Sequence, residues 1–244
     1  MNPSVATLDA VLAATWPAAD TCACGPFTLR RSPGGGSRVS AATLAWGRMP
    51  DPAEIDAAVA AMAGWGQVPR FRIRDGQARF DALLAARGFA RHDPTLIAAA
   101  ALAALPGPPP RLSTFAVWPP LAVLGEIWAD AGIGPDRRAV MARVTGPKTA
   151  ILGRVDDRPG GAAFVAAHDG IAMLHALAVR AQARRKGLGR RIVAGAAAWA
   201  RDHGCTHVAV AVTQANGPAR ALFAGLGLDA CTRYHYRVGA MDAD

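Results

Sequence analysis

Residues 174–189 read LHALAVRAQARRKGLG, and this stretch decides the fold. It begins as a short apolar segment, typical of a strand, and ends in a turn rich in cations and glycine. Six Arg or Lys side chains and no acid lie within residues 180–191. The glycines at 187 and 189 allow the backbone to approach an anion, and a helix that starts there presents free N–H groups. The stretch therefore predicts a phosphate-binding turn between a strand and a helix.

The residues that follow complete a strand, helix, strand unit. Apolar side chains recur every three or four residues over 188–203, which predicts an amphipathic helix, and Gly204 is a typical helix end. Residues 206–213, THVAVAVT, form an apolar and β-branched run typical of a strand covered on both faces. Two strands joined through a helix in this way are expected to be parallel.

Two common phosphate-binding motifs are missing from this unit. A dinucleotide-binding turn requires Gly-x-Gly-x-x-Gly, but Ile192 occupies the position of the third glycine. The nucleoside-triphosphate motif Gly-x-x-x-x-Gly-Lys-Ser/Thr is also absent. The turn therefore belongs to neither class.

The turn instead matches the pattern Gln/Arg-x-x-Gly-x-Gly/Ala, through Arg184, Gly187 and Gly189. With it, the chain resembles the GNAT superfamily of N-acetyltransferases, which bind acetyl-coenzyme A at this motif. A second family motif, Asn-x-x-Ala-x-x-Leu-Tyr-x-x-x-Gly-Phe, agrees in spacing with residues 216–228. The resemblance implies an α/β fold, α+β in some classifications. Its mixed sheet is mostly antiparallel and flanked by helices, with a splayed parallel pair formed by the family's fourth and fifth strands.

The resemblance also implies which residues bind acetyl-coenzyme A, the co-substrate. In the family, the pantetheine arm lies between the splayed strands and the pyrophosphate lies on the glycine turn. The residues that match these positions are Leu177, Ala178, Val179, Arg184, Arg185, Lys186, Gly187, Leu188, Gly189, Arg190, Asn216 and Phe223.

His175 is the candidate general base. It is the ionisable side chain of an apolar strand, and its ordinary pKa of about 6.5 suits proton transfer at neutral pH. The segment resembles a strand of arylalkylamine acetyltransferases in which histidines have that role. Regular alternation places His175 on one face with Leu177 and Val179. A purely structural role for this histidine is an alternative of equal weight.

The candidate for protonating the departing thiolate is less well defined. Phe223 stands where many family members have a tyrosine with this role, and phenylalanine has no proton to donate. Either another donor serves, with Tyr234, Tyr236 or water as candidates, or the thiolate leaves unprotonated. Among the side chains, Tyr236 is the candidate catalytic residue.

The distribution of charge and the cysteine content indicate which kinds of ligand the chain is expected to bind. The net charge of the 244 residues is +9, of which +2 falls within residues 1–110 and +7 within the rest. The excess positive charge lies in the half that contains the phosphate turn, as a coenzyme A ligand requires. A nucleic-acid-binding protein is expected to have a long basic face with interleaved aromatic residues, and the sequence has no such pattern. The spacing of Cys22 and Cys24 fits no zinc site. We expect no metal, no nucleic acid, no membrane span, no secretory signal and a cytoplasmic location.

The first half of the chain predicts strands at 27–31 and 38–45 around a flexible SPGGGS turn, a helix from Asp51, a strand at 69–74, a helix at 77–87 and a strand at 93–105. This order is similar to the GNAT plan, with DGQA at 75–78 in place of the phosphate turn. We expect a degenerate GNAT-like domain at 1–105, a proline-rich linker at 106–112 and a catalytic domain at 113–244. The alternative is an unrelated extension before a single domain.

The second half predicts a strand at 114–118, helices at 119–131 and 135–144, and a hairpin of 148–155 with 162–168 around residues 156–161. The sequence as a whole predicts an acetyl-coenzyme A-dependent N-acetyltransferase in which an amine attacks the thioester directly. The alternative is a catalytically impaired coenzyme A-binding or regulatory module. The acceptor, a small molecule or a peptide, is not identified, and a homodimer is left open.

Overall fold

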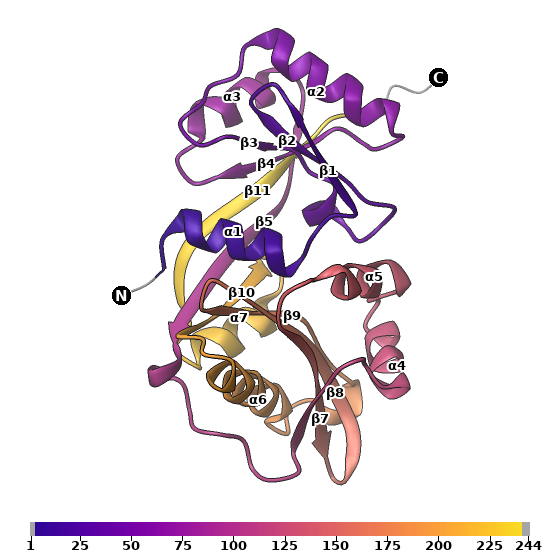
Figure 1. Cartoon of the computed structure of the whole chain (residues 1–244), viewed down its shortest axis with the longest axis vertical. Coiled ribbons are helices and arrows are strands. Elements are labelled where there is room, and N and C mark those ends of the chain that lie inside the picture. Colours follow the sequence, from indigo (N-terminus) through magenta and orange to yellow (C-terminus); the bar gives the residue numbers. More distant parts are fainter. Residues whose placement is uncertain (1–2, 241–244) are drawn as a thin grey trace.

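The computed structural model describes residues 3–240 and has two regions built around a shared sheet (Figure 1). The first region contains α1 (Val5–Thr15), β1 (Asp20–Cys24), β2 (Phe27–Arg31), β3 (Thr43–Leu44), α2 (Pro52–Gly64), β4 (Arg70–Arg74), α3 (Ala78–Ala86) and β5 (Ala90–Ala101). Short 3-10 helices lie at Ser37–Val39 and Leu102–Ala104.

The second region follows a proline-rich connection. It contains β6 (Thr114–Val117), α4 (Ala122–Asp130), α5 (Pro135–Arg143), β7 (Lys148–Val155), β8 (Arg158–His168), β9 (Ile171–Val179), α6 (Leu188–Asp202), β10 (His207–Thr213), α7 (Gly217–Ala224) and β11 (Asp229–Val238). A 3-10 turn at Ala181–Ala183 precedes α6. Helices α6 and α7 pack on one face of the sheet, and α1, α4 and α5 cover the other.

The main sheet has the strand order β4-β11-β5-β10-β9-β8-β7-β6, and β1, β2 and β3 form a second, three-stranded sheet. Every pair in the main sheet is antiparallel except β9 and β10, which are parallel and joined through α6. The mixed, mostly antiparallel architecture predicted from the sequence is confirmed.

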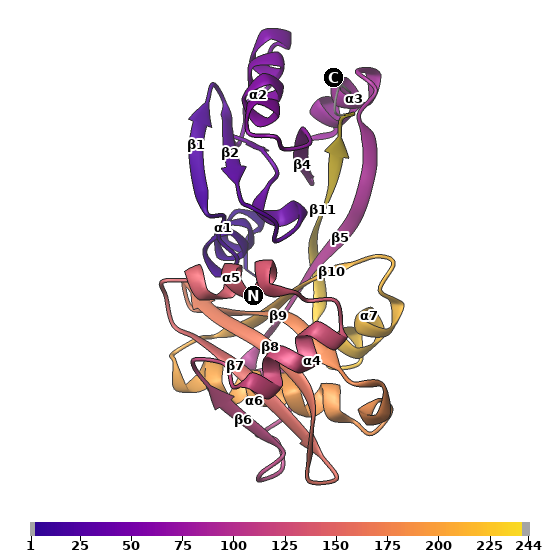
Figure 2. The same cartoon turned by 90° about the vertical axis from the view of Figure 1, so that its right-hand side faces the viewer.

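The two regions exchange strands. β5 belongs to the first region by sequence, yet it lies between β10 and β11, and β11 lies between β4 and β5. Figures 1 and 2 show both long strands running from one region into the other. The sheet is therefore continuous, and each region completes the other's edge.

The first region repeats the strand, helix, strand unit of the second. β3 and β4 flank α2 as β9 and β10 flank α6, and a single parallel bridge joins Ala42 to Phe71. The connection that corresponds to the phosphate turn is thus residues 45–51. The prediction that residues 75–78 occupy this place is wrong, because they join β4 to α3 on the far side of the unit.

The SPGGGS segment is packed rather than flexible. Gly34, Gly35 and Gly36 all have positive φ values of 76–90°, and a Cβ atom on Gly34 would meet the Asp136 carboxylate at 2.2 Å. A Cβ atom on Gly35 would meet Val140 at 2.9 Å. The glycines therefore let this loop lie directly against α5 of the second region.

Other predicted elements shift at their ends. The expected strand at 38–45 is reduced to β3, α4 begins at Ala122 after two prolines, and the β7–β8 turn is confined to Asp156 and Asp157. Both aspartates have positive φ values, as a tight two-residue hairpin turn requires. The predicted N-cap of α7 is confirmed, since the Asn216 side chain accepts a hydrogen bond from the Ala219 amide.

A buried ion-pair cluster attaches α1 to the first region. Asp9 on α1 accepts hydrogen bonds from Arg72 and Arg74 of β4, whose side chains are only 4% and 6% exposed. The Nε atoms of both arginines are buried without a partner, and Asp9 is the acid that pairs with both guanidinium groups.

Replacing Asp9 by Asn is expected to lower the free energy of unfolding by about 3 kcal/mol, since two buried guanidinium groups lose their counter-charge. Urea denaturation measures the change. The matched control is Asp56→Asn, which removes an exposed ion pair with Arg87 and is expected to cost less than about 1 kcal/mol. Equal stability of the Asp9 variant and the wild type would contradict this account.

Candidate active site

The two parallel strands separate at the centre of the sheet. β10 stays paired with β5 along its whole length, from His207 opposite Ala101 to Thr213 opposite Thr95. Its pairing with β9 ends at Leu174 opposite Val210, although β9 continues to Val179 alongside β8. A gap therefore opens between β9 and β10, as the sequence resemblance implied.

A β-bulge in β9 lies at the start of this gap. His175 pairs with Phe164 and Ala178 pairs with Ala162, so two residues of β9 oppose one of β8. Ala176 adopts a φ of 51°, and the Trp128 indole on α4 donates a hydrogen bond to its carbonyl at 2.9 Å. The backbone of residues 176–177 is thereby left outside the ladders on both sides.

The bulge overturns the predicted alternation of side chains. His175 contacts α1, whereas Leu177 and Val179 pack with the cluster beneath α6, which also contains Leu174. The prediction that Leu177 and Val179 share a face with His175 is wrong, because the extra residue at Ala176 reverses the alternation.

The predicted phosphate turn forms the N-terminus of α6. Gly187 is the N-cap residue with a φ of 74°, and no side chain caps the helix. The first-turn amides of α6 therefore have no capping partner. The Lys186 ammonium lies 2.6 Å from the Asp156 carboxylate and holds the pKa of that carboxyl below its ordinary value.

The glycine at position 189 is explained by packing against α7. A Cβ atom there would lie 3.1 Å from Leu222 on α7, so a small residue lets α7 approach the start of α6. The turn thus lies beside α7, which also carries Phe223 and follows Asn216.

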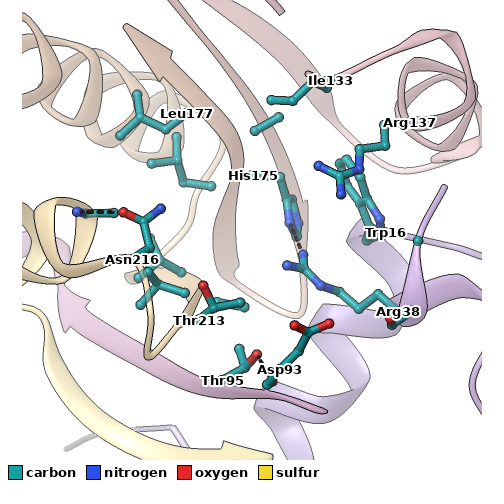
Figure 3. Close-up of a pocket in the computed structure, with 18 of the residues that line it drawn as sticks. Trp16, Arg38, Asp93, Thr95, Ile133, Arg137, His175, Leu177, Thr213 and Asn216 are labelled. Atoms are coloured by element: carbon teal, nitrogen blue, oxygen red, sulfur yellow. Dashed lines mark hydrogen bonds between the residues drawn. The ribbon is translucent and has the colours of Figure 1, made fainter. Parts of the chain in front are cut away.

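A cavity of about 370 Å³ lies at the gap between β9 and β10 (Figure 3). Residues 174–177 and 210–213 border it from the two strands. Other regions of the chain supply Trp16, Gly35, Gly36, Ser37, Arg38, Asp93, Thr95, Ile133, Arg137, Asn216, Ala219, Phe223, Tyr234 and Tyr236.

The cavity brings together only some of the predicted site residues. His175, Leu177, Asn216, Phe223 and Tyr236 line it. Ala178, Val179 and the turn residues 184–190 lie outside its lining, further along β9 and at the start of α6.

His175 is buried and held on both sides. Its Nε2 lies 2.9 Å from the Thr15 hydroxyl, and its Nδ1 lies 3.3 Å from the Arg38 guanidinium. Because arginine can only donate, Nδ1 is the acceptor and Nε2 carries the proton. The Thr15 hydroxyl donates to the Val11 carbonyl and so accepts from Nε2. The ring is a neutral tautomer whose lone pair is occupied.

The environment opposes protonation of this ring. Burial lowers the pKa of His175 well below its ordinary 6.5, and the nearby Arg38 charge lowers it further. The imidazole is therefore neutral at physiological pH.

Tyr234 and Tyr236 line the cavity from β11 and pack with α1, whereas Phe223 lines it from α7 and packs with the cluster beneath α6. Burial raises the pKa of Tyr236 well above its ordinary value, and the neighbouring Tyr234 raises it further. The Tyr236 hydroxyl thus keeps its proton. Phe223 is 6% exposed and contributes only apolar surface.

The sequence analysis missed most of the lining outside β9 and β10, including three charged residues and Trp16. Trp16, Arg38 and Asp93 come from the first region, and Arg137 comes from α5. Of these residues, only Asp93 could have been suspected from the local sequence. It precedes Pro94 within a predicted strand, and proline in a strand favours a bulge. The structure has this irregularity, with a φ of 45° at Asp93 and a register shift in the pairing of β5 with β11.

Part of the chain that forms this site matches a known protein family. Residues 126–228, which include α5, the β9–α6–β10 unit and α7, match the model of the acetyltransferase (GNAT) family. Residues 126–228 form a GNAT acetyltransferase domain. Members of this family transfer acyl groups, and the gap, the bulge and the uncapped α6 all fall within the GNAT domain.

Solved structures extend the likeness to the whole chain. A GCN5-related N-acetyltransferase from Kribbella flavida has a TM-score of 0.69 at 20% identity, over 100% of this chain and 99% of that chain. A functionally unknown conserved protein from Staphylococcus epidermidis has a TM-score of 0.66 at 9% identity, covering 89% and 92%. At such identities the likeness concerns the fold alone.

A tandem GNAT protein from the clavulanic acid biosynthesis pathway is also similar. Its TM-score is 0.58 at 14% identity, over 84% of this chain and 76% of that chain. A two-domain GNAT fold thus exists among the structural neighbours. No curated protein sequence matches the chain significantly.

Two searches of the described residues found nothing. Residues 3–240 contain no group of three or more His, Cys, Asp or Glu side chains that could hold a metal ion. Within the same residues, no helix has both the length and the hydropathy needed to cross a membrane.

The state of His175 predicts how stability depends on pH. Because the folded-state pKa lies below that of the unfolded chain, the unfolded chain binds more protons as the pH falls below about 6.5. The free energy of unfolding is expected to decrease by up to about 1.4 kcal/mol per pH unit from this group. Urea denaturation at pH 7 and pH 5.5 should show a smaller decrease for His175→Gln than for the wild type. Identical decreases in the two proteins would contradict the assignment.

Proposed function

We propose that the protein is an acetyl-coenzyme A-dependent N-acetyltransferase that acts on an amine acceptor. The observation that carries this proposal is the gap between β9 and β10, which leads from the cavity toward the uncapped N-terminus of α6. A thioester held in the gap would present its carbonyl to the cavity while its phosphates lie on the turn.

The proposed cofactor contacts are mainly backbone contacts. Residues 177–179 continue β9 beyond its pairing with β10, so no strand pairs with them on the side of the gap. The Val179 carbonyl accepts a hydrogen bond from the Arg184 guanidinium at 3.2 Å. The amides of residues 188–190 and the cations of residues 184–186 would bind the pyrophosphate. Asn216 and Phe223 would border the pantetheine arm, because both line the cavity on the side of α7.

The reaction needs an oxyanion donor and a proton acceptor. The Leu177 amide is our candidate donor, since the bulge removes residues 176–177 from both ladders and Leu177 lines the cavity. The neutral His175 is our candidate base. Its Nδ1 lone pair accepts from Arg38, so the base must act after the acceptor has drawn Arg38 away.

Tyr236 is the proposed donor to the departing thiolate. It lines the same cavity as Phe223, and burial keeps its hydroxyl protonated. In this reading Tyr236 has the role that Phe223 cannot fill.

We also propose a division of labour between the two halves. Residues 113–244 carry the transferase chemistry, and residues 1–105 form a degenerate GNAT-like domain that supports it, joined by the proline-rich residues 106–112. The repeated β3–α2–β4 unit and the tandem GNAT neighbour support this division. The proposed location is cytoplasmic.

Two observations favour the second candidate, a catalytically impaired coenzyme A-binding module. Phe223 lacks the usual hydroxyl, and the lone pair of His175 is occupied by Arg38. Both candidates require cofactor binding, and only the enzyme releases coenzyme A thiol when an amine is present.

Calorimetric titration with acetyl-coenzyme A tests the cofactor site. Gly187→Glu is expected to abolish binding, because it puts a carboxylate where the pyrophosphate would lie. The matched control is Gly204→Glu at the other end of α6, where φ is 69° and a Cβ atom also has open space. The two variants share the same backbone strain, so only the loss of the anion site separates them. A folded wild type that does not bind would contradict the proposal.

Thiol release with a panel of amines tests the base. His175→Gln is expected to lower kcat/KM by about a hundredfold, the usual contribution of a general base, and to remove the acidic limb of the pH profile. In the wild type that limb should lie well below pH 6.5 because the pKa of His175 is lowered. His235→Gln, which changes a histidine paired with Asp81 outside the cavity, is the control. A His175 variant with nearly wild-type rates would exclude the base.

A further inference from the structure

Three charged side chains meet in the cavity on the side away from Leu177 and Asn216 (Figure 3). Arg38 follows the glycine loop of the first region, Arg137 lies on α5, and Asp93 lies at the bulge of β5. Within residues 3–240, no acid is within ion-pair distance of either guanidinium, and no cation is within that distance of the Asp93 carboxylate. These charges thus face the cavity without a protein partner of opposite sign.

The two arginines are brought to the same wall by packing. The Arg137 guanidinium lies next to Gly36, where a Cβ atom would be 3.8 Å from it, and Arg38 is two residues further along the same loop. Arg38 lies against the Trp16 ring and His175, with its guanidinium 5.8 Å from the ring centre. Guanidinium groups bind carboxylates through paired hydrogen bonds. This wall is therefore suited to a carboxylate.

Asp93 supplies the complementary charge. Asp93 lies beside the end of β10, because the amide of Gln214, the residue after β10, donates to the carbonyl of the neighbouring Pro94 at 2.7 Å. Figure 3 shows its carboxylate directed toward the interior of the cavity, on the same side as Arg38. An ammonium group near Asp93 would lie at the mouth of the gap between β9 and β10, where the thioester carbonyl is proposed to lie.

We infer that the acceptor is a small amine that also carries a carboxylate, as an amino acid does. This inference rests on the proposed function. Arg38 and Arg137 would bind the carboxylate, and Asp93 would attract the ammonium. Polycationic acceptors are disfavoured, because two guanidinium groups face one carboxylate. The cavity of about 370 Å³ must also hold the end of the pantetheine arm, so the acceptor is small.

The same geometry connects acceptor binding to the base. A carboxylate that pairs with Arg38 competes with the Nδ1 lone pair of His175 for the guanidinium. Binding of the acceptor would then free Nδ1 at the moment when a proton must be removed from the ammonium. An amine acceptor without a carboxylate would leave the Arg38 guanidinium hydrogen-bonded to His175.

The test compares amino acids with their amides in the thiol-release assay, with the full-length protein and acetyl-coenzyme A. Amidation removes the carboxylate and lowers the pKa of the amine, so intrinsic reactivity favours the amide. We expect the amino acid to be preferred by about tenfold or more in kcat/KM, as the loss of a charge-assisted contact implies. Arg137→Gln should abolish this preference through a higher KM for the amino acid, with the KM for acetyl-coenzyme A unchanged.

The control variant is Arg138→Gln, which removes the next cation of the exposed face of α5 outside the cavity lining and should keep the preference. Equal use of the amide, or a preference that survives in Arg137→Gln, overturns the inference and leaves the proposed function standing. A raised KM for acetyl-coenzyme A in Arg137→Gln also overturns it, because the arginine would then serve the cofactor.

Failure of the proposed function has a different signature. If the folded protein binds acetyl-coenzyme A but no amine releases thiol, the enzyme is excluded. The charge inference is then decided by calorimetry with amino acids on the coenzyme A-loaded protein. Binding that Arg137→Gln abolishes and Arg138→Gln retains upholds it, and absence of binding overturns it.

Discussion

The site depends on one constraint, which is that the two central parallel strands are held by different antiparallel neighbours. β10 follows β5 through seven consecutive pairs, whereas β9 follows β8 and bulges at Ala176. Because each strand keeps its own partner, the two separate after Leu174 and Val210. β5 comes from the first half of the chain, so the gap that belongs to the GNAT domain is maintained partly by a strand from outside residues 126–228.

The first half also sets the electrostatics of the cavity. Thr15 at the end of α1 and Arg38 after the glycine loop hold the two nitrogens of His175, and together they fix its tautomer. Burial of the His175 ring and the nearby charge of Arg38 keep the ring neutral. A GNAT domain alone, without these residues, would leave His175 open on that side. The protonation state of a candidate catalytic group in one half is thus controlled by side chains of the other half.

What the sequence predicts well is local. The turn at residues 184–189, the α6 helix and the Asn216 cap follow from neighbouring residues and match the structure. The faces of β9 were predicted wrongly, because the bulge at Ala176 depends on the Trp128 indole, which lies 48 residues away. The alanines at 98–101 favour a helix as much as a strand, and they become strand because β10 and β11 pair on both sides. Arg38, Asp93 and Arg137 share a cavity only through tertiary packing, which no local pattern reports.

The two helices that follow β3 and β9 differ in the chemistry of their first turns. At α2, the Asp51 carboxylate accepts from the Glu54 amide, and the Glu54 carboxylate accepts from the Asp51 amide. This capping box uses the free amides and adds two negative charges where an anion would approach. At α6, Gly187 gives no side-chain cap, and the residues before it are cations. The same order of strand, helix and strand thus presents carboxylates at the start of α2, and uncapped amides beside cations at the start of α6, so the chemistry of the cap, more than the fold, distinguishes the two helix N-termini.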